Sequence, residues 1–315
     1  MINWLLLPLA EIFGLVSLVR RELYRCGVFS AERAGVPVIV VGNIVAGGGG
    51  KTPIVIALVQ ALQARGLIPG VAARGVGGNN EGVLMVEDDT DWRRCGDEPL
   101  LVRRRTGAMV CVARRRINAV RQLSAAGCDV ILCDDGLQHY ALRRDMEICA
   151  VNGAFGLGNG WLLPAGPLRE SCRRLHRCDW VAVSGEEEVA FNHPKMARVI
   201  IETDGIYASS LPDKKLTAAD FADQRVVAVA GIASPQRFFD KLQKMGIQTQ
   251  LERSLPDHGR LADVDFFTLA ADAVVMTEKD AIKYPQEDKR LYVLCIRAVL
   301  PPELIDSVIN KIYGF

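Results

Sequence analysis

The sequence predicts an α/β protein, with a mostly parallel sheet covered by helices on both faces and a smaller C-terminal α/β domain. Apolar runs such as residues 130–133 alternate with helical patterns along nearly the whole chain. Strands without polar alternation are typical of parallel sheets buried on both faces. The pattern weakens over the more polar residues 203–224 and restarts at residue 225. We therefore expect a linker there, with domains over residues 31–215 and 216–315.

Composition limits the class of protein. Of the 315 residues, 50% are hydrophobic and 24% are charged, which is typical of a well-cored globular chain. The formal net charge of +1 gives no overall field that would attract nucleic acid. The nine cysteines lie mostly in apolar runs and form no C-x-x-C pair, which argues against disulfides and a zinc site and favours a reducing cytoplasm. No obligate protein partner is evident.

An apolar segment of a different kind comes first. Residues 4–19 (WLLLPLAEIFGLVSLV) precede three arginines that end with Arg25. The segment is short for a membrane span and is interrupted by Pro8 and Glu11. It also lacks the basic start and small-residue cleavage site of a signal peptide. We expect residues 1–30 to form a helix that lies in the membrane interface, with arginines at the lipid phosphates. An ordinary helix docked on the core is the alternative.

The first predicted strand, residues 37–41, leads into a glycine loop and then into a helix predicted over residues 53–65. Glycine lets backbone N–H groups turn inward around phosphate oxygens, and the helix N-terminus adds positive charge. Lys51 would reach the β- and γ-phosphates, and the Thr52 hydroxyl would hold magnesium. The segment therefore predicts a phosphate loop that binds ATP, formed by Val45, Ala46, Gly47, Gly48, Gly49, Gly50, Lys51 and Thr52.

Val45 departs from the strict pattern G-x-x-x-x-G-K-[ST], which has glycine at that position. The departure shifts the expected tight turn to Gly47 and Gly48. Ala46 replaces a lysine that many ATPases with a G-G-x-G-K-[ST] loop carry, which counts against a membrane-partitioning ATPase.

Further elements follow in order. An acidic pair, Asp134 and Asp135, ends the apolar strand of residues 128–135. Adjacent carboxylates repel unless a cation lies between them, so this strand end is a candidate metal or phosphate site; a pair of loop aspartates is the alternative. Other strands are predicted over residues 108–113, 146–152, 179–184, 273–277 and 291–296, and helices over residues 115–127 and after Pro302.

Six motifs together resemble one known family, tetraacyldisaccharide 4'-kinase, the lipid A kinase. They are AGGGGKTP, CGDEPLL, DDGLQHYALRRD, LPAGPLRE, LPDH and TEKDAIK, in the family's order and over nearly the whole chain. The resemblance implies a peripheral enzyme on the cytoplasmic face of the bacterial inner membrane. With Mg²⁺ and ATP it would phosphorylate the 4'-hydroxyl of an acylated disaccharide 1-phosphate, giving the bis-phosphorylated lipid A precursor (lipid IVA).

The resemblance also implies roles for matched residues. Asp97 would be the catalytic base, paired with His258, and Lys51 would act on the phosphates. The metal ligands would be Thr52, Asp134, Asp135 and Glu170. Nucleotide contacts besides the loop would come from Arg116, His139 and Arg169.

Several alternatives stay open on the residues alone. Asp97 also suits a helix N-cap, and His258 a surface turn. His139 also suits the core, and Arg169 with Glu170 a surface pair. Two other functions are a membrane-associated ATPase switch, which Ala46 disfavours, and a kinase with a soluble acceptor, which the apolar N-terminus disfavours.

Overall fold

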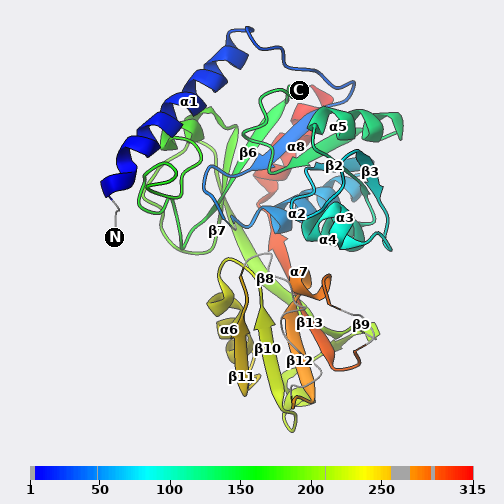
Figure 1. The fold of residues 1–315 in the computed structure, drawn as a ribbon. Helices are drawn as coiled ribbons and strands as arrows, with labels where there is room; N and C mark the ends of the chain where they lie inside the picture. The colour runs from blue at the N-terminus through cyan, green and yellow to red at the C-terminus, as the bar shows by residue number, and fades with distance from the viewer. Residues whose placement is uncertain (1–3, 48, 210, 257–269, 285–287, 315) are drawn as a thin grey trace.

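The structure is a computed structural model that describes residues 4–47, 49–209, 211–256, 270–284 and 288–314. Two bodies are joined by long strands (Figure 1). The strands of the upper body are β1 (Val38–Gly42), β2 (Pro69–Ala73), β3 (Val83–Val86), β4 (Met109–Ala113), β5 (Val130–Asp134), β6 (Met146–Asn152) and β7 (Trp180–Ser184). Its helices are α1 (Leu7–Arg25), α2 (Lys51–Gln63), α3 (Trp92–Cys95), α4 (Asp97–Thr106) and α5 (Arg116–Ala125), with 3-10 turns over Trp4–Leu6 and Cys172–Arg177.

The strand order confirms the expected mostly parallel sheet. The order β7-β6-β1-β5-β2-β4 is parallel throughout, and β3 adds an antiparallel edge. Strand β1 pairs with β5 so that Val41 is opposite Asp134. The glycine loop after β1 and the acidic pair at the end of β5 therefore start at the same edge of the sheet.

Apolar side chains cover both faces of this sheet. All five residues of β1 are buried, as the continuous apolar run predicts. Helix α2 packs on one face through Ile54, Val55, Leu58 and Leu62, which recur at the spacing of one helical stripe. Each such side chain contributes about 1.5–3 kcal/mol when fully buried. Helix α2 begins at Lys51, two residues before the expected start.

The lower body continues the sheet. Its elements are β8 (Met196–Ala208), β9 (Leu211–Leu216), β10 (Val226–Ala230), β11 (Leu251–Ser254), β12 (Ala273–Thr277), β13 (Leu291–Val299), α6 (Pro235–Lys244), α7 (Glu278–Ala281) and a 3-10 turn over Ala218–Phe221. Strand β8 pairs with β7 at its start and with β13 along the rest, so it belongs to both bodies.

Two features of the structure concern the junction between the two bodies. Residues 203–224, expected as a linker, contain the end of β8, all of β9 and a 3-10 turn; strand pairing overrides their weak sequence pattern. Helix α8 (Pro302–Tyr313) returns to the upper body, where Leu304 and Val308 join the core beside α2. The domain boundary between residues 215 and 216 stays a prediction.

Helix α1 lies along one side of the upper body, as Figure 1 shows, and confirms a helix in the apolar N-terminal segment. Most of its large apolar side chains are exposed, including Leu9, Ile12, Leu15 and Val16. Within the described part of the chain, every helix is too short or too polar to span a bilayer.

Candidate active site

The glycine loop is held by backbone contacts with residues 167–169. The Ala46 N–H donates to the Pro167 carbonyl at 2.7 Å, and the Arg169 N–H donates to the Ile44 carbonyl at 2.7 Å. Gly47 and Gly50 have φ of +102° and +69°, a region that favours glycine. The LPAGPLRE motif therefore supports the loop directly; Gly48 lies outside the described residues.

Asn43 shapes the entrance of the loop. Its Oδ1 accepts the Val45 N–H at 2.7 Å, and its carbonyl accepts Gln138 Nε2 at 3.0 Å. A Cβ added at Gly49 would overlap the Asn43 amide. Glycine at position 49 thus leaves room for Asn43, a residue that sequence reasoning missed although it follows a buried strand directly.

Lys51 and Thr52 open α2 and are both buried. The Lys51 ammonium lies 3.4 Å from Oδ1 of Asp135. Arg169 Nη1 donates to both oxygens of Asp135, at 3.0 and 2.9 Å. Three predicted residues therefore form one charged cluster, in which Asp135 positions two cations at the mouth of the loop.

The two aspartates differ in electrostatic state. Burial raises the pKa of Asp134 to about 7, with the nearby Glu98 carboxylate adding to the effect. Its Oδ1 is buried and has no hydrogen-bond partner among the described residues. Burial also opposes ionisation of Asp135, but Lys51 and Arg169 outweigh it and lower the pKa below its ordinary value. Asp135 adopts a φ of +51°, unusual for a residue other than glycine.

Arg116 holds the backbone beneath this pair. It is 3% exposed, and its Nη2 donates to the carbonyls of Asp134 and Asp135 at 2.5 and 3.2 Å. In the part of the chain that the structure describes, its Nε has no hydrogen-bond partner. His139 follows in the same loop, where burial and the charges of Arg116 and Arg144 lower its pKa to about 4. His139 is therefore neutral at pH 7.

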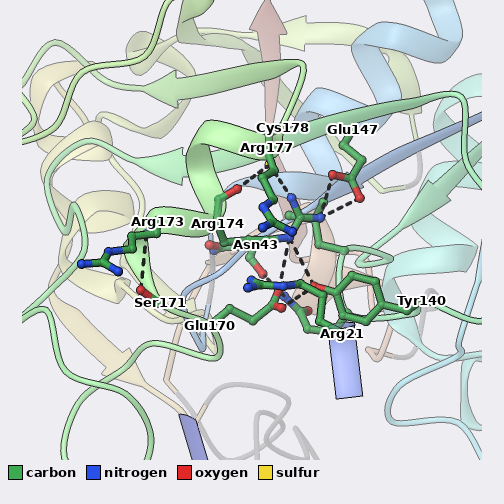
Figure 2. Close-up of polar contacts among 12 residues, drawn as sticks. Arg21, Asn43, Tyr140, Glu147, Glu170, Ser171, Arg173, Arg174, Arg177 and Cys178 are labelled. Carbon is green, nitrogen blue, oxygen red and sulfur yellow. Dashed lines mark hydrogen bonds and ion pairs between the residues drawn. The ribbon is translucent and has the colours of Figure 1, made fainter. Parts of the chain in front are cut away.

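Glu170 lies in a polar network beside the loop (Figure 2). Its carboxylate accepts hydrogen bonds from the Tyr140 hydroxyl and, at 3.0 Å, from Gln138 Nε2. Arg174, which sequence reasoning missed, lies 3.8 Å from Glu170 and donates to both oxygens of Glu147 at 2.6 Å. The network connects the LPAGPLRE segment to β6 through buried charged groups.

Asp97 is the first residue of α4, and Gly96, not Asp97, is the N-cap. Its side chain is buried; Oδ1 accepts the Glu98 N–H at 2.9 Å, and Oδ2 lies 3.3 Å from the ammonium of Lys283. Because Glu98 raises the pKa of Asp134, the start of α4 lies near the acidic end of β5. His258 lies outside the described residues, so its pairing with Asp97 stays a prediction.

Among the residues that the structure describes, no cluster of three or more His, Cys, Asp or Glu side chains could hold a metal ion. The unpartnered Oδ1 of Asp134 nevertheless fits a cation, because a buried carboxylate oxygen without a partner is costly. The ligand set expected from the sequence stays a prediction.

A cavity of about 570 Å³ lies between α1 and the Cys172–Arg177 turn. Four arginines line it, Arg21, Arg25, Arg173 and Arg177, together with three glutamates, Glu11, Glu22 and Glu170. Glu22 forms ion pairs with Arg21, Arg25 and Arg177. Figure 2 shows Arg21 and Arg177 next to the Glu170 network. The cavity therefore combines charged groups of both signs with apolar side chains of α1.

The model of the family Tetraacyldisaccharide-1-P 4'-kinase (LpxK) matches residues 2–313. The chain belongs to this family. Curated relatives named tetraacyldisaccharide 4'-kinase include one from Herminiimonas arsenicoxydans, 41% identical over 99% of this chain and 92% of its own. Another, from Polaromonas naphthalenivorans, is 48% identical over 89% and 81%. These matches confirm the resemblance found in the six motifs.

A solved structure of LpxK from Aquifex aeolicus, described as the "apo" form in complex with ATP, has the same fold. Its TM-score is 0.84 at 26% identity, and the match covers 98% of both chains. The family's architecture therefore extends over both bodies described above.

Proposed function

We propose that this protein transfers the γ-phosphate of ATP to the 4'-hydroxyl of tetraacyldisaccharide 1-phosphate, as the names of its relatives indicate. The observation that carries the proposal is the family match over residues 2–313. The buried charged cluster at the glycine loop supports it, because phosphoryl transfer depends mainly on positioning and charge neutralisation.

ATP would bind with its phosphates on the loop of residues 45–52. Helix α2 follows this loop directly, and the first N–H groups of a helix have no partner within the helix and favour an anion there. Lys51 and Arg169, now held by Asp135, are the cations that would meet the β- and γ-phosphates. Arg116 and His139 would contribute to the nucleotide site at this same end.

Magnesium would be held by Thr52 and by the carboxylates of Asp134 and Asp135, with the Glu170 carboxylate on the metal side of the site. When bound, the ion neutralises phosphate charge. The unpartnered Asp134 oxygen favours this assignment; Glu170 already accepts protein hydrogen bonds through both oxygens, so it would act beside the ion through the Gln138 and Tyr140 network.

Asp97 would accept the proton of the 4'-hydroxyl as the sugar oxygen bonds to the γ-phosphorus. The bond from phosphorus to the β–γ bridging oxygen breaks, and ADP leaves with that electron pair. His258 would assist Asp97. The burial of Asp97 near the acidic end of β5 supports this role.

The acceptor would approach from the membrane side. The exposed apolar residues of α1 suit the interface of a bilayer. We therefore place the protein peripherally on the cytoplasmic face of the inner membrane.

The test is transfer of label from γ-labelled ATP, with Mg²⁺, to tetraacyldisaccharide 1-phosphate in detergent micelles. We expect labelled bis-phosphorylated lipid from the wild type and at least 100-fold less from Lys51→Ala and Asp97→Ala. Lys311→Ala and Asp223→Ala, exposed residues of the same types, serve as matched controls. ATP binding or hydrolysis without lipid product would overturn the kinase proposal and favour a nucleotide switch.

A further inference from the structure

Ion pairs join α4 of the upper body to α7 of the lower body and to the turn that follows α7. Three of them cross this interface: Lys283–Asp97 at 3.3 Å, Lys279–Glu98 at 3.2 Å and Arg105–Glu278 at 2.7 Å. Two of these pairs lie near the start of α4, and Arg105 lies near its end. The ammonium of Lys283, from the lower body, therefore lies next to the carboxylate of Asp97, the proposed base.

The Lys283 pair differs from the other two in burial. The side chains of Lys283 and Asp97 are 1% and 4% exposed, whereas those of Lys279 and Glu98 are 16% and 29% exposed. A buried ammonium is costly unless carboxylates compensate it closely. Lys283 thus has little freedom to leave Asp97.

A second carboxylate, that of Asp280, also lies close to Lys283. Asp280 Oδ1 lies 3.5 Å from the Lys283 ammonium. Asp280 Oδ2 accepts the Gly231 N–H at 2.8 Å and the Thr277 hydroxyl at 2.6 Å. The end of β10 and the start of α7 therefore hold Asp280, which in turn holds Lys283.

We propose that Lys283 is a positioning residue for phosphoryl transfer: it neutralises and orients the Asp97 carboxylate from the lower body. The Glu98 N–H binds one carboxylate oxygen of Asp97, and the Lys283 ammonium lies at ion-pair distance from the other. This inference rests on the proposed function, since Asp97 must act as the base.

The experiment compares Lys283→Met with Arg105→Met in the micellar kinase assay. Both variants break ion pairs between α4 and the lower body. Arg105 pairs with Glu278 and Asp204, whereas Lys283 pairs with Asp97, so only the first variant touches the proposed base. We expect kcat of Lys283→Met to fall about 10–100-fold, the usual cost of losing a group that orients a functional residue. KM for ATP should stay within about twofold, because the glycine loop is unchanged, and Arg105→Met should keep kcat within about threefold. Equal kcat losses in both variants would show a general clamp between bodies and overturn the proposal.

The double variant Asp97→Asn/Lys283→Met tests whether Lys283 acts through Asp97. It also provides a test if the single variant Lys283→Met does not fold. It should match Asp97→Asn in kcat, because non-additivity marks residues that act as a unit. A further tenfold loss, or loss of folding that Asp97→Asn does not show, would overturn the proposal.

The wild type separates this inference from the proposed function. No phosphorylated lipid from the wild type would reject the kinase function itself. Normal product from the wild type together with normal kcat in Lys283→Met would reject only the role of Lys283.

Discussion

Val45 occupies the place where the strict loop pattern has glycine, and its packing gives the reason. The side chain is 5% exposed and packs in the core that includes Leu168. The left-handed backbone falls instead on Gly47 and Gly50. The departure at residue 45 therefore contributes stability without hindering the turn of the loop.

We expect Val45→Gly to lower the free energy of unfolding by about 2–4 kcal/mol, from lost apolar burial and the added chain entropy of glycine. Urea unfolding would measure it. Val76→Gly, at a 53% exposed valine, is the control and should cost less than about 1 kcal/mol. An equal loss in both variants would contradict the packing role.

His139 predicts a pH dependence of stability. Its folded pKa of about 4 is below the ordinary value of 6.5, so the unfolded chain binds the proton more tightly. Stability from this group is present above pH 6.5 and is lost as pH falls towards 4. Between pH 7 and 4.5 the wild type should lose about 1–2 kcal/mol more than His139→Gln, measured by urea unfolding without nucleotide. Parallel curves of unfolding free energy against pH for the two proteins would contradict this role of His139.

At the scale of elements, buried strands were the most predictable part. Uniform apolar runs located β1 and β5, and the acidic pair followed from the end of β5. The pairing of β8 with β13 could not be predicted, since β8 is mixed in polarity and its partner lies far along the chain. Nor could the contact of Lys283 with Asp97, although TEKDAIK contains Lys283, because no local pattern shows which helices meet.

Helix α1 gives a prediction at this scale. If its exposed face meets the bilayer, Ile12→Ser/Val16→Ser should reduce co-flotation with anionic phospholipid vesicles at least tenfold, because two apolar side chains lose about 3 kcal/mol of burial together. The control Val83→Ser/Ile200→Ser changes exposed apolar residues elsewhere and should float like the wild type. Unchanged flotation of the α1 variant would exclude the membrane role of this face.

At the scale of the whole molecule, β8 and β13 hold the two bodies in one sheet, and the ion pairs of α4 with the lower body join them as well. A ligand on the loop should therefore stabilise the entire fold. Saturating ATP with Mg²⁺, at about 100 times its Kd, should add about 2.7 kcal/mol and raise Tm by several degrees. Lys51→Ala should lose most of this shift in a thermal melt, whereas Lys311→Ala should keep it. A full shift in Lys51→Ala would place ATP elsewhere.

The return of α8 to the upper body also matters during protein synthesis. Domains usually fold in the order in which they leave the ribosome. Here the apolar side of α2 is covered by Leu304 and Val308, which are translated only after the lower body. Until α8 has been synthesised, part of the apolar core of the upper body therefore stays exposed to solvent. A premature stop codon within α8 would leave this apolar surface exposed and prone to aggregation.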